Sequence, residues 1–163
     1  MSATVVFQQS YGQTPSVVSK TSFNFIPADD GTASVSSAPM RIPTSGTAYS
    51  YELWLQGKLS VAPASSVFNF KVWIDATDKP DGIDITANST EVSSYTTPVN
   101  TESSQGTRVS LFNYQSYDSS LSLPGTLISV NDVTSFLILQ LSIDYTAFPT
   151  SLSIPICYAY DEV

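Results

Sequence analysis

The sequence predicts an all-β protein, an antiparallel β-sandwich of jelly-roll-like type, with an immunoglobulin-like sandwich as the alternative. Three observations favour this class. Ser, Thr and aromatic residues are abundant and strong helix formers are few, a composition typical of strands and turns. Apolar and polar residues alternate with a period of two in several segments. Pro, Gly, Asp and Ser separate these segments, as expected for a sandwich or barrel.

The first third of the chain holds two weaker strand candidates, residues 3–9 (ATVVFQQ) and 22–27 (SFNFIP). The first segment fits two interpretations that the sequence leaves open. It is either the first strand of the sandwich or part of an N-terminal arm, residues 1–10, that adds a strand to a neighbouring chain. The whole chain, residues 1–163, fits a single domain. The apolar residues of the first segment, and candidate partner contacts, are Val5, Val6 and Phe7.

The clearest strand spans residues 48–62 (AYSYELWLQGKLSVA). Gly57 interrupts its inward row, where a bulge or bend is expected. Its outward face is polar, with Glu52 facing solvent, except for Trp54. The period of two predicts that the inward face holds Tyr49, Tyr51, Leu53, Leu55, Leu59 and Val61.

Residues 66–76 (SVFNFKVWIDA) continue the alternation. The outward face again carries a tryptophan, Trp73, among polar residues. Outward aromatic side chains stack on sugar rings or anchor partner proteins, unless a loop or strand covers them as a second small core. We take Trp54 and Trp73 as candidate partner-binding residues and keep the covered alternative open. The residues predicted to point inward are Phe68, Phe70, Val72 and Ile74.

Four aspartates follow at every third position in DATDKPDGID, namely Asp75, Asp78, Asp81 and Asp84. Calcium binds six to eight oxygen ligands, so these carboxylates are weak candidates for a calcium site. Their spacing differs from that of the helix–loop–helix calcium loop, and no glutamate closes the run. The KPDG stretch also has the residues of a tight turn. We therefore predict a solvated hairpin, with no metal and no cofactor.

Three weaker strands are predicted next, at residues 82–87 (GIDITA), 107–115 (TRVSLFNYQ) and 126–130 (TLISV). The strong strand at residues 134–147 (TSFLILQLSIDYTA) should be central. Its inward row runs from Leu137 through Leu139, Leu141 and Ile143 to Tyr145. Gln140 lies on the opposite face, where its replacement should cost under about 1 kcal/mol.

The last predicted strand spans residues 151–162 (SLSIPICYAYDE). Pro155 cannot donate a backbone hydrogen bond, so this strand should lie at a sheet edge or carry a bulge. An exposed edge can pair with a strand of another chain. We therefore take Tyr158 and Tyr160 as further candidate partner-binding residues.

Composition argues against several functions. A net charge of −8 with scattered basic residues disfavours nucleic-acid binding. The absence of His removes the commonest general base and the nucleophilic triads that use it, so no catalytic residue is assigned. Cys157 is the single cysteine, so no internal disulfide can form. A glycosidase would need two placed carboxylates, such as Glu52 with Glu91 or Glu102.

The sequence also bears on where the protein folds and acts. The first ten residues lack a basic region followed by a long apolar run, so we expect no signal peptide and folding in a cytoplasm. No apolar stretch of about 18 residues occurs, so we expect no membrane partner. A Ser/Thr-rich body without a secretion signal is typical of virion proteins, which fold inside a host cell and act outside it.

Two stretches resemble a known class of proteins. Residues 67–100 (VFNFKVWIDATDKPDGIDITANSTEVSSYTTPVN) and 136–163 (FLILQLSIDYTAFPTSLSIPICYAYDEV) together cover roughly the second half of the chain. Their order of strands and turns resembles that of small β-sandwich structural proteins of tailed bacteriophages, of the head-decoration or tail-associated type. The resemblance carries no catalytic motif.

The resemblance implies a non-enzymatic virion protein, most simply a capsid decoration protein that assembles in many copies. Its partners would be the major capsid protein or other virion subunits, together with further copies of itself. The alternative is a carbohydrate-binding module or a receptor-binding domain associated with a tail fibre, using Trp54 or Trp73.

Overall fold

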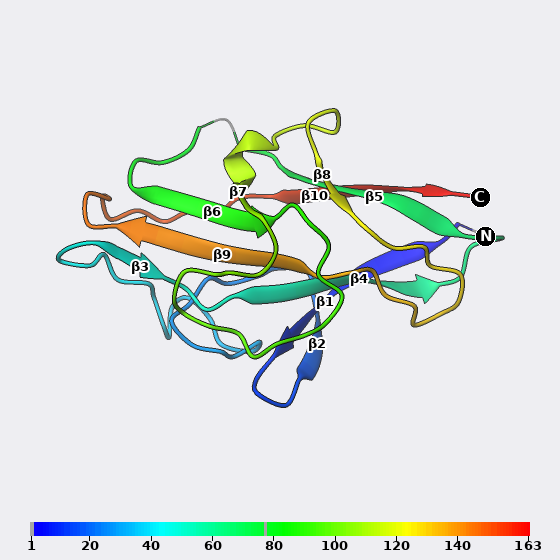
Figure 1. Cartoon of the computed structure of the whole chain (residues 1–163), viewed down its shortest axis with the longest axis horizontal. Coiled ribbons are helices and arrows are strands. Elements are labelled where there is room, and N and C mark those ends of the chain that lie inside the picture. The colour runs from blue at the N-terminus through cyan, green and yellow to red at the C-terminus, as the bar shows by residue number, and fades with distance from the viewer. Residues whose placement is uncertain (1, 77) are drawn as a thin grey trace.

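The computed structural model describes residues 2–76 and 78–163, and nearly all of its regular structure is β-strand. Two antiparallel sheets pack against each other, so the predicted all-β sandwich is confirmed (Figure 1). Within these residues, one short 3-10 helix, Leu111–Asn113, is the helical element. Within the described part of the chain, no helix is long and apolar enough to cross a membrane.

The larger sheet, sheet A, has seven strands in the order β2–β1–β4–β9–β6–β7, and β3 pairs with β9 beyond the end of β4. The smaller sheet, sheet B, has the order β10–β5–β8. Sheet A consists of β1 (Thr4–Tyr11), β2 (Ser16–Lys20), β3 (Thr47–Tyr49), β4 (Leu53–Val61), β6 (Ile83–Asn88), β7 (Arg108–Ser110) and β9 (Leu137–Asp144). Sheet B consists of β5 (Val67–Ile74), β8 (Leu121–Leu123) and β10 (Ile156–Glu162).

The connections explain the jelly-roll-like character. From β4 to β10, each strand lies in the opposite sheet to the one before it, except for the step from β6 to β7. Connections that cross between two packed sheets are typical of double-sheet jelly rolls. The core therefore forms from residues far apart in the sequence.

The predicted alternation decides which side chains form this core. Leu139 and Leu141 of β9 point inward and are 0% and 9% exposed. Leu53, Leu55 and Leu59 of β4 and Phe70, Val72 and Ile74 of β5 are likewise buried, which confirms most of the predicted facing. Val61, also predicted to point inward, is 39% exposed, because the pairing of β4 with β1 shifts register beyond Leu59. Tyr145 is an exception, because β9 ends at Asp144 and the tyrosine ring is 56% exposed.

A bulge in β5 corrects one further prediction. Asn69 has φ of 53°, in the left-handed region where Asn is among the more tolerant residues. The pairing of β5 with β10 shifts register at the same place. An extra residue in one strand reverses the alternation before it. Val67 is therefore the inward residue, at 0% exposed, and Phe68 is only half-buried.

Several weak elements differ from expectation. Residues 22–27 form no strand, and the irregular segment around them packs against the core through Phe23, Phe25, Met40 and Ile42. The strand expected at 126–130 is only a bridge between Leu127 and Val67. Strands β2 and β8 were not predicted, because their short sequences are rich in Ser and lack a long alternation.

Candidate functional site

A long irregular segment, residues 89–107, crosses the outer face of sheet A between β6 and β7, and we call it the strap (Figure 1). Trp54 lies beneath it and is 0% exposed. Its ring contacts Tyr95 of the strap and Phe136, each with a centroid separation of 5.1 Å. The prediction of an exposed Trp54 is therefore wrong, and the covered alternative, a second small core, is what the structure contains.

Buried polar groups hold the strap on the sheet. The Gln140 side-chain amide donates to the carbonyls of Ser50 (3.0 Å) and Thr101 (2.7 Å), and its oxygen accepts the Ser103 N–H (2.9 Å). Gln140 is 1% exposed, which corrects its predicted place in solvent. It does lie on the predicted outer face, but the strap covers that face.

Glu52 is also beneath the strap, at 2% exposed, so the prediction that it faces solvent is wrong. Its Oε2 accepts the Trp54 indole N–H (2.9 Å) and the Val99 N–H (3.3 Å). Glu91 and Glu102 are exposed on the strap itself. Glu52 therefore has a structural role here, and it is enclosed rather than open to a substrate.

Arg108 fastens β7 to its neighbours on the same face. Its guanidinium donates to the carbonyls of Ile138 (2.9 Å) and Thr86 (2.9 Å). Burial lowers the pKa of Arg108 to about 10, and the charge of Glu52 partly opposes that shift. An arginine with this many backbone contacts serves packing of the strap and sheet.

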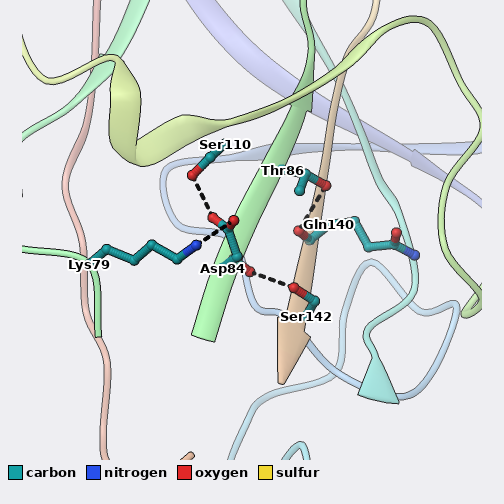
Figure 2. Close-up of polar contacts among 6 residues, drawn as sticks. All are labelled: Lys79, Asp84, Thr86, Ser110, Gln140 and Ser142. Carbon is teal, nitrogen blue, oxygen red and sulfur yellow. Dashed lines mark hydrogen bonds and ion pairs between the residues drawn. The ribbon is translucent and has the colours of Figure 1, made fainter. Parts of the chain in front are cut away.

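The aspartate run does not gather into one cage. Asp84 lies on β6, where its carboxylate pairs with the Lys79 ammonium (2.7 Å) and accepts the Ser110 hydroxyl (2.6 Å) (Figure 2). Asp75, Asp78 and Asp81 are exposed, and Thr77 lies outside the described residues. In residues 2–76 and 78–163, no group of three or more His, Cys, Asp or Glu residues could hold a metal ion.

A shallow polar hollow of about 200 Å³ opens beside Asp84. Asp144 lines the same hollow. Hydrogen bonds from the backbone N–H and the hydroxyl of Thr146 to its carboxylate hold the pKa of Asp144 below its ordinary value. A glycosidase needs a carboxyl group that stays protonated to act as an acid, so this carboxylate does not fit that role. Figure 2 shows the polar row continuing along β6 and β9, where the Thr86 hydroxyl reaches the Gln140 carbonyl (3.5 Å). The hollow is lined by Thr47, Lys79, Gly82, Ile83, Asp84, Ser142 and Asp144.

On the outer face of sheet B, Trp73 is half-buried and stands edge-to-face with Tyr117, at 5.9 Å between centroids and 87° between planes. The Lys71 ammonium lies 3.8 Å from the centre of the Tyr117 ring, a cation–π contact. The two rings are perpendicular, so they form no flat platform. Binding of a partner by Trp73 stays a prediction.

The predicted partner-binding residues of the two terminal strands do come together. A groove of about 240 Å³ lies between the β1–β2 side of sheet A and strand β10, and we call it the seam groove. Its walls include the predicted Val5, Val6, Phe7 and Tyr158, and Lys20 is its one charged lining residue. Phe23, Thr21 and Ile156 also line it, and the core residues Leu55 and Leu137 form its floor.

The walls of the seam groove are fastened to each other. The Tyr158 hydroxyl donates to the Val5 carbonyl (3.2 Å), and the Tyr160 hydroxyl donates to the Ala3 carbonyl (3.1 Å). Both carboxylate oxygens of Glu162 accept the Ala3 N–H at 3.0 Å. These contacts fix the spacing between β1 and β10, so the groove is present without a partner.

The same contacts correct one of the two interpretations of the N-terminus. Residues 4–11 are strand β1, paired with β2 on one side and β4 on the other. Val5 is 3% exposed, so this segment belongs to the sandwich and is not a free arm. Strand β10 lies at an edge of sheet B, as predicted, but it begins at Ile156, after Pro155, and not at residue 151.

Sequence reasoning missed the other side of the seam groove. Phe23 contacts Phe7 edge-to-face at 6.3 Å, whereas the sequence predicts a strand for its segment and gives no sign of a groove. The sequence gives no reason to place Lys20 at a site, because an isolated lysine forms no pattern. One signal was available, since Phe23 and Phe25 alternate in a segment too short and too rich in Asn and Pro for a central strand.

Comparisons with known proteins matched no family model, no curated protein and no solved structure to this chain. The functional argument therefore rests on the surfaces described above. Of these, the seam groove is the one that combines a preformed apolar concavity with a sheet edge.

Proposed function

We propose that this chain is a non-enzymatic structural protein of a virus particle, most simply a capsid decoration protein that binds in many copies. Its partners are the major capsid protein or other virion subunits, and it acts on the particle after synthesis in the host cytoplasm. The observation that supports this proposal is the seam groove beside the edge strand β10. Val5, Val6, Phe7 and Tyr158, which the sequence suggests as candidate partner contacts, line this groove.

The mechanism in this proposal is burial of surface. An apolar groove loses its contact with water when a partner side chain fills it, and each Å² of apolar surface removed from water contributes roughly 25 cal/mol. The backbone groups of an edge strand add hydrogen bonds with a partner strand. A contact of modest strength suffices, because many copies on one particle act together.

The charge distribution suits a protein partner. The chain has a net charge of −8, which opposes contact with nucleic-acid phosphates and with anionic membrane surfaces. Lys20 places a positive charge in the seam groove. A partner segment that is apolar and carries an acidic residue would match it.

The test is binding to particles that lack this protein. Purified chain is added to such particles and occupancy is measured by mass spectrometry or electron microscopy. Thr21→Trp, which fills the groove from an exposed position, should reduce occupancy at least about tenfold, as expected for loss of one buried aromatic-sized contact. Thr126→Trp, an equal change in an exposed loop, is the matched control. Absence of binding by the unaltered chain would refute the proposal.

A second candidate, glycan or receptor binding, has one supporting observation, the half-buried Trp73 beside Tyr117 on the outer face of sheet B. An aromatic ring with an open face can stack on a sugar. A glycan array probed with the unaltered chain and with Trp73→Ala decides between them. Saturable binding to a glycan that Trp73→Ala abolishes would favour this candidate over decoration.

A further inference from the structure

Strand β10 presents the longest free edge among the strands that end the two sheets of the described chain. It has seven residues, whereas β2 has five and β7 and β8 have three each. Short edge strands and charged edge residues discourage pairing with another chain. β2 ends at Lys20 and β7 begins at Arg108. From Ile156 to Tyr160, β10 has no charged residue and no proline, so this edge lacks such protection.

One set of backbone groups in β10 faces its neighbour β5. Just beyond the end of β10, the Val163 N–H donates to the Ser66 carbonyl (3.0 Å), and the Ser66 N–H donates to the Val163 carbonyl (3.0 Å). Just before its start, the Pro155 carbonyl accepts the Asp75 N–H (3.0 Å). Antiparallel pairing alternates along a strand, and the extra residue of the bulge lies in β5, so the alternation in β10 is unbroken. The odd-numbered residues of β10 therefore bond to β5.

The other set of backbone groups faces away from β5. It includes the N–H and C=O groups of Ile156, Tyr158 and Tyr160. Among the described residues, these groups make no backbone hydrogen bond with a segment outside sheet B. A row of unpaired N–H and C=O groups at this spacing is complementary to the backbone of one further strand.

The side chains at this edge point towards the seam groove. Ile156 and Tyr158 are the two residues of β10 that line it. Directly opposite side chains of two paired strands lie on the same face of the sheet. A strand added to β10 would therefore place every second side chain beside Ile156 and Tyr158, against the apolar lining of the groove. Lys20, which makes no salt bridge in the described chain, lies in the same groove and suits an acidic residue of that strand.

We infer that the partner of this chain contributes an extended segment, which pairs with β10 as a fourth strand of sheet B. The segment carries apolar side chains at alternate positions and an acidic residue within reach of Lys20. This inference rests on the proposed function, and it specifies that the virion partner is bound through a strand and not through a folded surface. Sheet B, with three strands against the seven of sheet A, gains its new strand beside the seam groove.

The first experiment supplies the strand from the chain itself. A short linker of Gly and Asn follows Val163 and leads into about seven residues, the length of β10, in which Val and Thr alternate with Val opposite Ile156, Tyr158 and Tyr160. NMR-detected hydrogen exchange should show these three amides exchanging fast in the unaltered chain. With the extension they should exchange at least about tenfold more slowly, because their N–H groups become hydrogen-bonded.

The control extension has Pro at two positions whose N–H groups would pair with β10, since Pro has no N–H to donate. It should leave the three amides unprotected. The same lack of protection with the Val and Thr extension would overturn the inference, because the edge would then not accept a strand even when the strand is tethered beside it.

The second experiment blocks the edge without changing a side chain. Cys157 is the single cysteine, so residues 157–163 can be synthesised and joined to residues 1–156 by ligation at its thiol. A methyl group on the backbone nitrogen of Tyr158 points away from β5. It should reduce occupancy on particles at least about tenfold, through a lost hydrogen bond and a steric block, and leave the melting temperature within a few degrees. The control is a methyl group on the backbone nitrogen of Ala159, which should lower the melting temperature because that N–H bonds to β5.

The two proposals fail separately. Equal occupancy by the unaltered chain and by the chain methylated at Tyr158 would overturn pairing with β10 and leave decoration standing. A chain whose edge accepts the tethered strand, but which never binds particles, would keep the strand site and remove the virion partner.

Discussion

At the residue scale, Gln140 shows how a polar residue in a central strand becomes part of the interior. One side of β9 faces the core, and the other side faces the strap. The Gln140 amide satisfies carbonyls of the strap and of the segment before β4, and accepts the Ser103 N–H. Removing a buried amide of this kind lowers stability chiefly because its buried partners are left without hydrogen bonds.

Replacement of Gln140 is therefore expected to be damaging. Gln140→Ala should lower the free energy of unfolding by about 2–3 kcal/mol, since unpaired buried groups each cost about 1–3 kcal/mol and the strap can relax to admit water. Leu139→Ala, on the core side, should cost about 2–5 kcal/mol. Ser142→Ala on the same outer face is the control and should cost under about 1 kcal/mol. Urea denaturation measures all three, and equal values for Gln140→Ala and Ser142→Ala would contradict the role of Gln140 in holding the strap on the sheet.

The aspartate run yields a second prediction at this scale. The Asp84 carboxylate already pairs with Lys79 and Ser110, and three further aspartates are exposed. A ligand that binds only the folded state raises the melting temperature by mass action. We expect melts in chelator and in millimolar calcium to agree within about 1 °C. A rise of many degrees in calcium, absent in Asp84→Asn, would show a calcium site.

At the element scale, the sequence predicts the strands that have a long apolar–polar alternation. It does not predict burial where an irregular segment covers a face of a sheet. Leu139 and Leu141 were placed correctly because period two requires their facing. Trp54, Glu52 and Gln140 were misplaced because alternation reports which face a residue occupies and not whether an irregular segment covers that face. The strap has no periodic pattern, so its path was not predictable from sequence. For the same reason, only the β1 and β10 side of the seam groove was anticipated.

The strap should be sensitive to alkaline pH through Tyr95. Its hydroxyl donates to the Gly12 carbonyl (2.7 Å), and burial raises its pKa to about 12, from about 10 in an unfolded chain. A phenol whose pKa is raised on folding contributes stability that is complete below pH 10 and is lost as pH rises towards 12. Arg108, whose pKa is lowered to about 10, acts in the opposite direction over the same range.

Comparison with Tyr95→Phe isolates the contribution of the phenol. Between pH 10 and 12, the unaltered chain should lose more unfolding free energy than Tyr95→Phe does. A pH titration of tyrosine ionisation, followed by absorbance at about 295 nm, should show a late rise near pH 12 in the unaltered chain and not in Tyr95→Phe. Tyr117→Phe, at an exposed tyrosine, is the control. Identical pH dependence in the unaltered chain and Tyr95→Phe would place the Tyr95 hydroxyl in solvent.

At the scale of the whole molecule, the start of β1 and the end of β10 lie at one end of the sandwich, and the connection from β9 to β10 begins at the other end (Figure 1). The Ala3 N–H bonds to Glu162, and the Val163 carbonyl accepts the N–H groups of Ser65 and Ser66. The first and last strands therefore depend on each other. Adjacent, surface-exposed termini are the situation in which circular permutation is tolerated.

Two rearranged chains test this dependence. A permutant that joins residue 163 to residue 2 through a short Gly-Ser linker and opens between Thr44 and Ser45, in an exposed loop, keeps every strand intact. It should melt within a few degrees of the unaltered chain. Deletion of residues 1–10 removes most of β1, which lies between β2 and β4, and should leave no cooperative transition. A folded deletion variant would restore the free-arm interpretation of the N-terminus, because only an arm outside the sandwich can be removed without exposing Leu55 and Leu59 of β4.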